Sequence, residues 1–243
     1  EQAHYFRGDY ERVVELATGN LAALPPDSAS ETFGAALPIS IYERYRLFQS
    51  LAELGRFAEA ARYEAEALRL VESTHQSTHQ AYAVVMVHDA ATVLHLQKGD
   101  WMQARSLIER GLAAYRTANI TFELPSALAI YSWVLAQCGE ASEALIQVRE
   151  AEQLLERDAA SGFFTFHRGA YRSMGRACLL LGRLDEAQSL GDRALKHSLA
   201  FAGAAAHTLR LLGDIATHAD RFDPNTGEAH YREALALAEP RGM

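Results

Sequence analysis

Apolar residues recur every three or four positions along most of the chain, which is the spacing of an amphipathic α-helix. Five long segments of this kind each end at a glycine or an aspartate, and a more polar helical segment follows each one. These five segments span residues 40–55, 81–99, 126–139, 166–182 and 204–220. No segment alternates with the period of two that a half-buried β-strand shows. The pattern therefore predicts an all-α protein.

The polar helical segments are copies of one repeat. GRFAEAARYEAEAL at 55–68, GDWMQARSLIERGL at 99–112 and GRLDEAQSLGDRAL at 182–195 each begin with a glycine. Taking that residue as the anchor aligns six copies, and the last copy is degenerate. The anchors are Gly8, Gly55, Gly99, Gly139, Gly182 and Asp220. Five residues after the glycines lie Val13, Ala60, Ala104, Ala144 and Ala187, and twelve after lie Asn20, Ala67, Gly111, Ala151 and Ala194.

This alignment predicts pairs of helices joined by a turn. A glycine ends the first helix cheaply because it lacks a Cβ and adopts the left-handed conformation. Small residues seven apart lie on one face of the second helix and allow a neighbour to approach closely. The position seven before the anchor in the first helix is also small in four of five copies. Its residues are Phe48, Thr92, Ser132, Gly175 and Gly213.

The small positions and the turn glycine resemble the tetratricopeptide repeat. The resemblance implies a right-handed α-solenoid of about six helix-turn-helix repeats. The intervals between the glycine anchors are 47, 44, 40 and 43 residues, longer than the roughly 34 of the plain repeat. Extra residues must lengthen helices or loops, and one such loop is visible at 21–38, where Pro25, Pro26 and Pro38 prevent a continuous helix.

Longer phrases resemble one bacterial family more closely. They include LAELGRFAEA, LHLQKGDWMQARSLIERGLAAYRTANI and EAHYREALALAEPRGM. Members combine a class III adenylate/guanylate cyclase or another output domain with a STAND-type ATPase and long C-terminal repeats. The resemblance implies that residues 1–243 form a single repeat domain from a longer signalling protein and act as its sensor or scaffold arm. No GxxxxGK[ST] phosphate loop occurs, so this chain is not the ATPase module.

The charge and composition of the chain exclude some classes of binding partner. The formal net charge of −8 argues against nucleic acid and against an anionic membrane surface, since both require a basic face. No apolar run approaches the roughly 18 residues that span a bilayer. The two cysteines, Cys138 and Cys178, lie in apolar helical sequence without CxxC spacing. We therefore expect reduced core thiols and a cytoplasmic location.

The sequence offers little for catalysis. His75 and His79 are four residues apart and could share one helix face, but zinc needs three or four ligands and none of the others is evident from spacing. Neither cysteine has an activating partner in the sequence, and no GxSxG elbow occurs. We expect no metal, no cofactor and no enzymatic activity.

The resemblance to tetratricopeptide repeats implies instead a binding groove lined by the first helices. Its positions lie thirteen, ten and six residues before each anchor. They are Tyr42, Tyr45 and Gln49; Met86, Asp89 and Val93; Ser126, Ala129 and Trp133; Gly169, Arg172 and Arg176; and His207, Arg210 and Asp214. The early part is aromatic and apolar, whereas the later part is cationic.

These positions predict a protein-interaction module that binds a protein or peptide. Arg172, Arg176 and Arg210 could hold a carboxylate bidentately, or they could merely pair with acids such as Asp185, Glu186 or Asp214. Trp133 could anchor a ligand or simply pack against neighbouring helices. Three alternatives stay open: a small-ligand sensor like the repeat domain of maltose-regulator-type transcription activators, a self-association module that forms a homodimer, and a metal-dependent enzyme around His75 and His79.

Overall fold

The computed structural model describes residues 1–25, 30–73, 78–160 and 169–243, and within these ranges each apolar segment of the sequence contains a helix. The described residues form twelve α-helices and a short 3₁₀ turn, and no strand occurs among them. The helices are α1 Gln2–Arg7, α2 Tyr10–Ala23, α3 Ile39–Glu53, α4 Phe57–Ser73, α5 Thr78–Lys98, α6 Trp101–Thr117, α7 Leu124–Gln137, α8 Ala141–Ala160, α9 Ala170–Leu180, α10 Leu184–Ser198, α11 Ala202–Ala216 and α12 Pro224–Ala238, followed by the 3₁₀ turn Glu239–Arg241.

The turn glycines do what the alignment predicts. All five anchors have positive φ, between 69° at Gly182 and 83° at Gly8. At Gly55 the backbone N–H groups of Gly55 and Arg56 donate to the carbonyls of Ala52 and Leu51, at 3.0 and 2.8 Å. This crossed pair of hydrogen bonds is the Schellman motif, which satisfies the last carbonyls of a helix. The predicted glycine caps are therefore confirmed.

The sixth turn is built differently. Helix α11 ends at Ala216, four residues before Asp220, and α12 begins at Pro224. The Asp223 carboxylate accepts a hydrogen bond from the Thr226 backbone N–H at 3.1 Å, so a side-chain N-cap starts the last helix. Asp220 therefore marks the loop but does not itself cap a helix.

The small residues of the second helices lie where helices pack together. Ala60, Ala67, Ala104 and Ala151 have no exposed surface. A Cβ at Gly111 would lie 3.1 Å from the Cβ of His88, so this position on α6 must stay small where α5 crosses it. The first copy departs from the alignment, because Asn20 is exposed.

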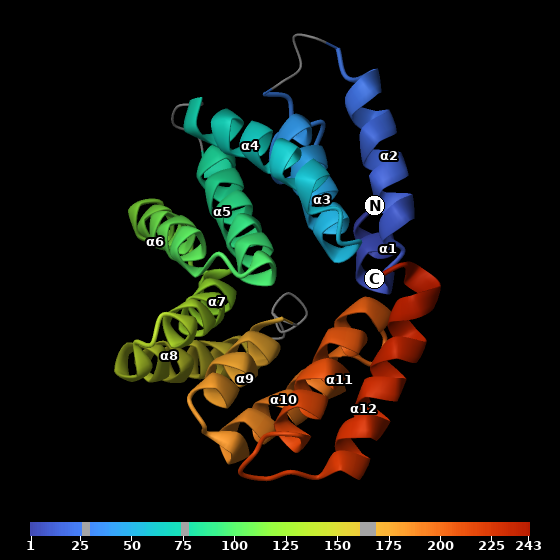
Figure 1. The fold of residues 1–243 in the computed structure, drawn as a ribbon. Coiled ribbons are helices and arrows are strands. Elements are labelled where there is room, and N and C mark those ends of the chain that lie inside the picture. The colour runs from blue at the N-terminus through green and yellow to red at the C-terminus, as the bar shows by residue number, and fades with distance from the viewer. Residues whose placement is uncertain (26–29, 74–77, 161–168) are drawn as a thin grey trace. The chain divides into compact units, whose positions relative to one another are not determined.

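The helices pack into two compact units. The first unit comprises residues 1–5, 9–121 and 243, and the second comprises residues 6–8 and 122–242. In the first, α3 packs on α2, α4 and α5, and α5 packs on α4 and α6. In the second, α7 packs on α8 and α9, α9 on α10, and α11 on α10 and α12 (Figure 1). Consecutive pairs thus pack in chain order within each unit, which confirms the predicted all-α repeat fold.

None of the described helices is long and apolar enough to cross a bilayer. That a single domain spans residues 1–243 stays a prediction.

Candidate functional site

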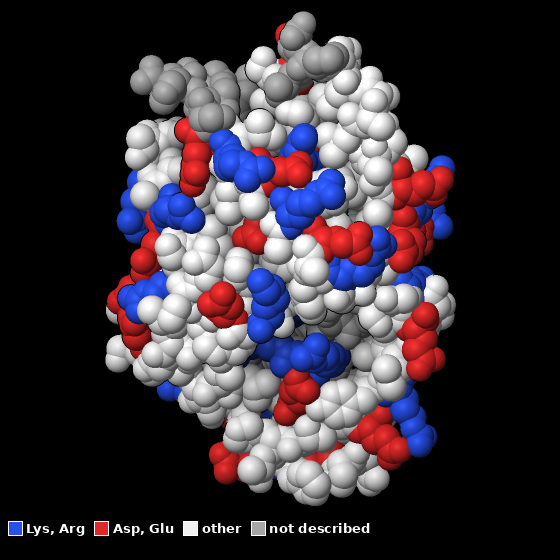
Figure 2. Space-filling view, turned by 45° about the horizontal axis from the view of Figure 1, so that its top comes forward, with Lys and Arg blue, Asp and Glu red and all other residues white. Residues whose placement is uncertain are grey.

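Charged side chains of both signs are mixed over the surface. Figure 2 shows Lys and Arg interspersed with Asp and Glu on the face drawn there. Many of them form ion pairs across or along helices, such as Arg44 Nε with Glu66 Oε2 at 2.9 Å and Arg105 Nε with Glu109 Oε1 at 2.8 Å. On such a surface, an arginine or lysine side chain that makes no ion pair within the protein is available to bind an acidic partner.

The cationic positions predicted from the sequence come together on two helices of the second unit. Arg172 and Arg176 lie on α9, and Arg210 and Asp214 lie on α11, with half-buried His207 on the same helix. We call Arg172, Arg176 and Arg210 the arginine cluster. Burial lowers the pKa of Arg176; the Asp214 carboxylate opposes this shift, and the charges of Arg210 and Arg172 add to it. Arg172 and Arg210 are therefore both close enough to act on Arg176.

Arg176 is neutralised within the protein. Its Nη1 donates to Asp214 Oδ2, and the side chain of Arg176 is only 17% exposed. Asp214 Oδ1 in turn accepts a hydrogen bond from the Tyr231 hydroxyl of α12 at 2.7 Å. This network holds the carboxylate in place, so Arg176 joins α9 to α11 and does not offer a free charge.

Arg172 and Arg210 differ from Arg176. Neither makes a hydrogen bond or an ion pair with any residue in the described part of the chain, and Arg210 is exposed while Arg172 is half-buried. The second unit thus presents two guanidinium groups on neighbouring first helices that are uncommitted toward its described residues. Such groups can grip a carboxylate through two parallel N–H···O bonds.

Trp133 lies on α7 in the same unit. The ring is half-buried, and its Nε1 is shielded from solvent with no acceptor among the described residues. Trp133 occupies the repeat position that Arg176 and Asp214 occupy on α9 and α11. Since Arg176 and Asp214 contact each other, this position faces the neighbouring first helix in at least that pair.

The aromatic positions of the first unit surround a residue that the sequence reasoning missed. Arg46 is 5% exposed, and its guanidinium carbon lies 5.0, 5.2 and 4.9 Å from the ring centroids of Tyr5, Tyr42 and Tyr45. Its Nη1 donates to Gln49 Oε1 at 3.3 Å. We call these five residues the aromatic cradle. The alternation of aromatic residues and arginine in YERYR was the signal that could have revealed it.

Two further groove positions lie within the packing of the first unit. Asp89 is 9% exposed and accepts a hydrogen bond from the Tyr115 hydroxyl of α6 at 2.7 Å. Met86 is half-buried and packs against the core of α3, α4 and α5. Asp89 therefore contributes to the packing of α5 on α6. Its carboxylate is buried and does not line the open groove that the sequence had predicted.

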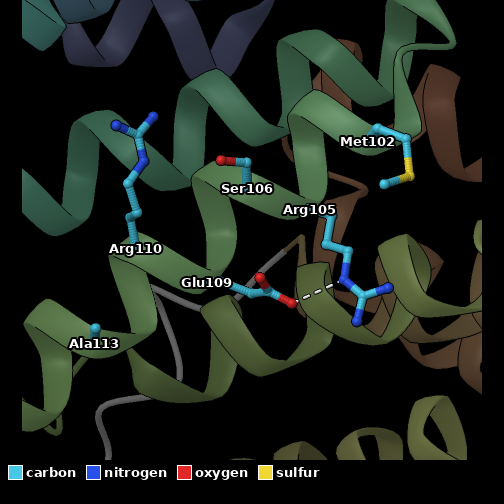
Figure 3. A pocket seen from close by; sticks show the side chains of 6 residues that line it. All are labelled: Met102, Arg105, Ser106, Glu109, Arg110 and Ala113. Atoms are coloured by element: carbon cyan, nitrogen blue, oxygen red, sulfur yellow. Dashed lines mark hydrogen bonds and ion pairs between the residues drawn. The ribbon is translucent and has the colours of Figure 1, made fainter.

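A shallow hollow of about 510 Å³ lies along one face of α6 and was not anticipated from the sequence. Figure 3 shows its lining side chains, which all come from this helix: Met102, Arg105, Ser106, Glu109, Arg110 and Ala113. Both arginines are already paired, Arg105 with Glu109 and Arg110 with Glu72 at 3.2 Å. The hollow thus offers apolar contact through Met102 but no uncommitted charge.

The described residues contain no group of three or more His, Cys, Asp or Glu side chains that could hold a metal ion. His75 lies outside these residues, and the side chain of His79 is not described either. Burial raises the pKa of Cys178 to about 12, so its thiol is a poor nucleophile at neutral pH.

Among the comparisons with known proteins, only those with solved structures gave matches. No family model matches the chain, and no curated protein matches its sequence. Among solved structures, BtubC (BKLC) from P. vanneervenii is similar with a TM-score of 0.58 and 14% identity over 95% of this chain and 91% of that one. MamA AMB-1 has a TM-score of 0.37 and 18% identity over 83% of this chain and 93% of that one. The similarity to BtubC concerns the fold alone, and together with the consecutive packing of helix pairs described above it makes the chain an all-α helical-repeat protein.

Proposed function

We propose that this chain is a non-enzymatic interaction module that binds a protein or peptide partner on the first helices of its repeats. Arg172 and Arg210 hold an acidic group of that partner. The observation that carries the proposal is that these two guanidinium groups lie uncommitted beside an Arg176 that Asp214 already neutralises.

The geometry supports recognition of a carboxylate. A guanidinium group presents its donors in a rigid planar fork, so two of them on neighbouring helices favour a planar acid in a defined orientation. The network of Tyr231, Asp214 and Arg176 fixes α9 against α11 and α12. A preformed site loses less conformational entropy on binding than a flexible one.

The proposal extends to the role of the module in a larger protein. The resemblance to cyclase- and STAND-ATPase-associated repeats supports a sensor or scaffold arm that reports partner binding to an output domain. Fusion of the full-length protein's output domain to wild-type and charge-reversed repeats would test it, because only the wild type should change output when the partner is added.

The direct test is affinity capture from the source cell with Arg172→Glu/Arg210→Glu as bait beside the wild type. We expect the partner to be depleted at least about tenfold in the variant, because reversal places like charges against its acidic group. The matched control is Arg149→Glu/Arg232→Glu, which makes the same charge change at exposed arginines on α8 and α12. Circular dichroism should show equal helicity for all three proteins.

Equal recovery of the partner by both variants would refute the role of Arg172 and Arg210. Recovery of no partner by the wild type would favour the small-ligand alternative. A metabolite that raises the melting temperature of the wild type would then be the evidence for that alternative.

A further inference from the structure

Arg46 is the one arginine among the described residues that is nearly inaccessible to solvent, at 5% exposure. All of its observed partners are neutral. Its Nε donates to the Tyr42 hydroxyl at 3.2 Å and its Nη1 to Gln49 Oε1 at 3.3 Å. The rings of the aromatic cradle surround the rest of the group at 4.9 to 5.2 Å. The cradle thus holds a whole positive charge among uncharged groups.

Three other partly buried arginines among the described residues each have a carboxylate partner. Arg176 pairs with Asp214, Arg193 with Glu152, and Arg44, on the same helix as Arg46, with Glu66 at 2.9 Å. In the described part of the chain no carboxylate pairs with Arg46. A buried charge is costly unless an opposite charge and hydrogen bonds satisfy it, and neighbouring rings compensate only in part.

The acid one turn earlier on α3 does not supply the missing charge. Glu43 accepts a hydrogen bond from Asn20 Nδ2 at 3.1 Å and is 1% exposed. Burial, together with the nearby Glu1, raises the pKa of Glu43 to about 8. Its carboxyl group is therefore mostly protonated near pH 7 and leaves the cradle positively charged.

The guanidinium group of Arg46 has N–H donors that make no hydrogen bond within the described residues. It carries five N–H bonds, and the hydrogen bonds to Tyr42 and Gln49 use two of them. Its Nη2 has no hydrogen-bond partner among the described residues and is not one of their fully shielded unpartnered atoms, so Nη2 keeps some exposed surface. Nη2 lies with Nη1 at the end of the group where a carboxylate can accept two parallel hydrogen bonds.

We propose that the aromatic cradle is a second anion-binding site, in which Arg46 takes a single carboxylate from an acidic peptide segment. A planar carboxylate matches the geometry of the Nη1 and Nη2 edge of a guanidinium group. The inference rests on the proposed function only in that a peptide supplies the acid. The cradle lies in the first unit and uses none of the arginine cluster in the second.

The test measures binding of fluorescein-labelled hexaglutamate by fluorescence anisotropy at low ionic strength, with hexaglutamine as the neutral probe. The protein is the full chain carrying Arg172→Gln/Arg210→Gln, so that the proposed site in the second unit no longer binds an acidic group. We expect this protein to bind hexaglutamate and not hexaglutamine. Adding Gln49→Glu should weaken binding at least about tenfold, because the new carboxylate forms an ion pair with Arg46 inside the protein and competes with the peptide.

Two controls keep the result specific. Gln49→Glu should raise the melting temperature, because it gives Arg46 an opposite charge, so its loss of binding cannot come from unfolding. Arg44→Gln removes one positive charge from the same helix and should change the affinity less than twofold.

Absence of hexaglutamate binding in the Arg172→Gln/Arg210→Gln protein would overturn the inference and leave the proposed function standing. Equal affinities of the Gln49→Glu and Arg44→Gln proteins would overturn it as well. The side-chain Nε–Hε resonance of Arg46 provides an independent readout in the wild type, where hexaglutamate should shift it.

Discussion

Arg172 and Arg176 are four residues apart on α9, yet only Arg172 keeps its charge for a partner. Asp214 reaches Arg176 from α11 and is itself held by the Tyr231 hydroxyl. The sequence could predict both arginines as groove residues and could name Asp214 as an alternative partner. It could not decide which arginine Asp214 would bind, because that depends on the separation of two helices.

Glu123 offers a prediction at the scale of one residue. It precedes α7 without forming a side-chain cap, and burial raises its pKa from 4.5 to about 7. A carboxyl group whose folded-state pKa is raised holds its proton more tightly in the folded protein. Stability therefore falls as the pH rises from about 4.5 to 7 and stays reduced above that range.

Glu123→Gln removes this dependence, since the amide has no proton to lose. We expect the variant to be more stable than the wild type at pH 8 by on the order of 2 kcal/mol, and similar to it at pH 4. Urea unfolding at both pH values measures the difference, with the exposed Glu150→Gln as control. A difference that is the same at both pH values would contradict the assignment to Glu123.

At the scale of the helix, the turn glycines explain why the repeat can be recognised in the sequence. Five first helices end at a left-handed residue, and glycine adopts this conformation cheaply. Helix α11 ends without one, and a side-chain cap at Asp223 starts the next helix, so the sixth boundary was the least well predicted. The prediction that position 20 is a packing position was wrong for another reason: on helix α2 the Asn20 side chain is exposed to solvent.

Gly182→Ala tests this explanation. Gly182 has φ of 69°, and nothing lies within 4 Å of the site of an added Cβ. The substitution should therefore destabilise the protein only through backbone strain, by about 1–2 kcal/mol. Thermal or urea unfolding measures the loss.

Gly19→Ala is the matched control. Its site is equally open and exposed, but Gly19 lies inside helix α2, where alanine is favoured over glycine, so stability should rise by up to about 1 kcal/mol. Equal losses at the two positions would show that left-handed geometry is not what the repeat glycines provide.

At the scale of the whole molecule, the sequence predicted the elements better than the surfaces. Helical periodicity and small anchors specify which helices form and which faces pack, because both depend on short sequence intervals. Groove positions were taken from the register of a shorter repeat, and Tyr45 and Asp89 proved to be nearly buried. Arg46 was missed because its surroundings combine α1 with α3, residues about 40 positions apart in the sequence.

The net charge of −8 gives the uncommitted arginines their significance. An acidic protein repels acidic partners in general, so binding of one through Arg172 and Arg210 requires local contact and should weaken with added salt.

The most direct measurement places a photo-crosslinking amino acid at position 207 on α11, one turn before Arg210, so that Arg172 and Arg210 both remain. Position 149 on α8 is the control, and the crosslinked partner is identified in the source cell. We predict a partner crosslinked from position 207, through a segment that contains Asp, Glu or a chain-terminal carboxylate, and little from position 149. Crosslinks from position 149 alone would contradict this prediction and assign binding to the second helices.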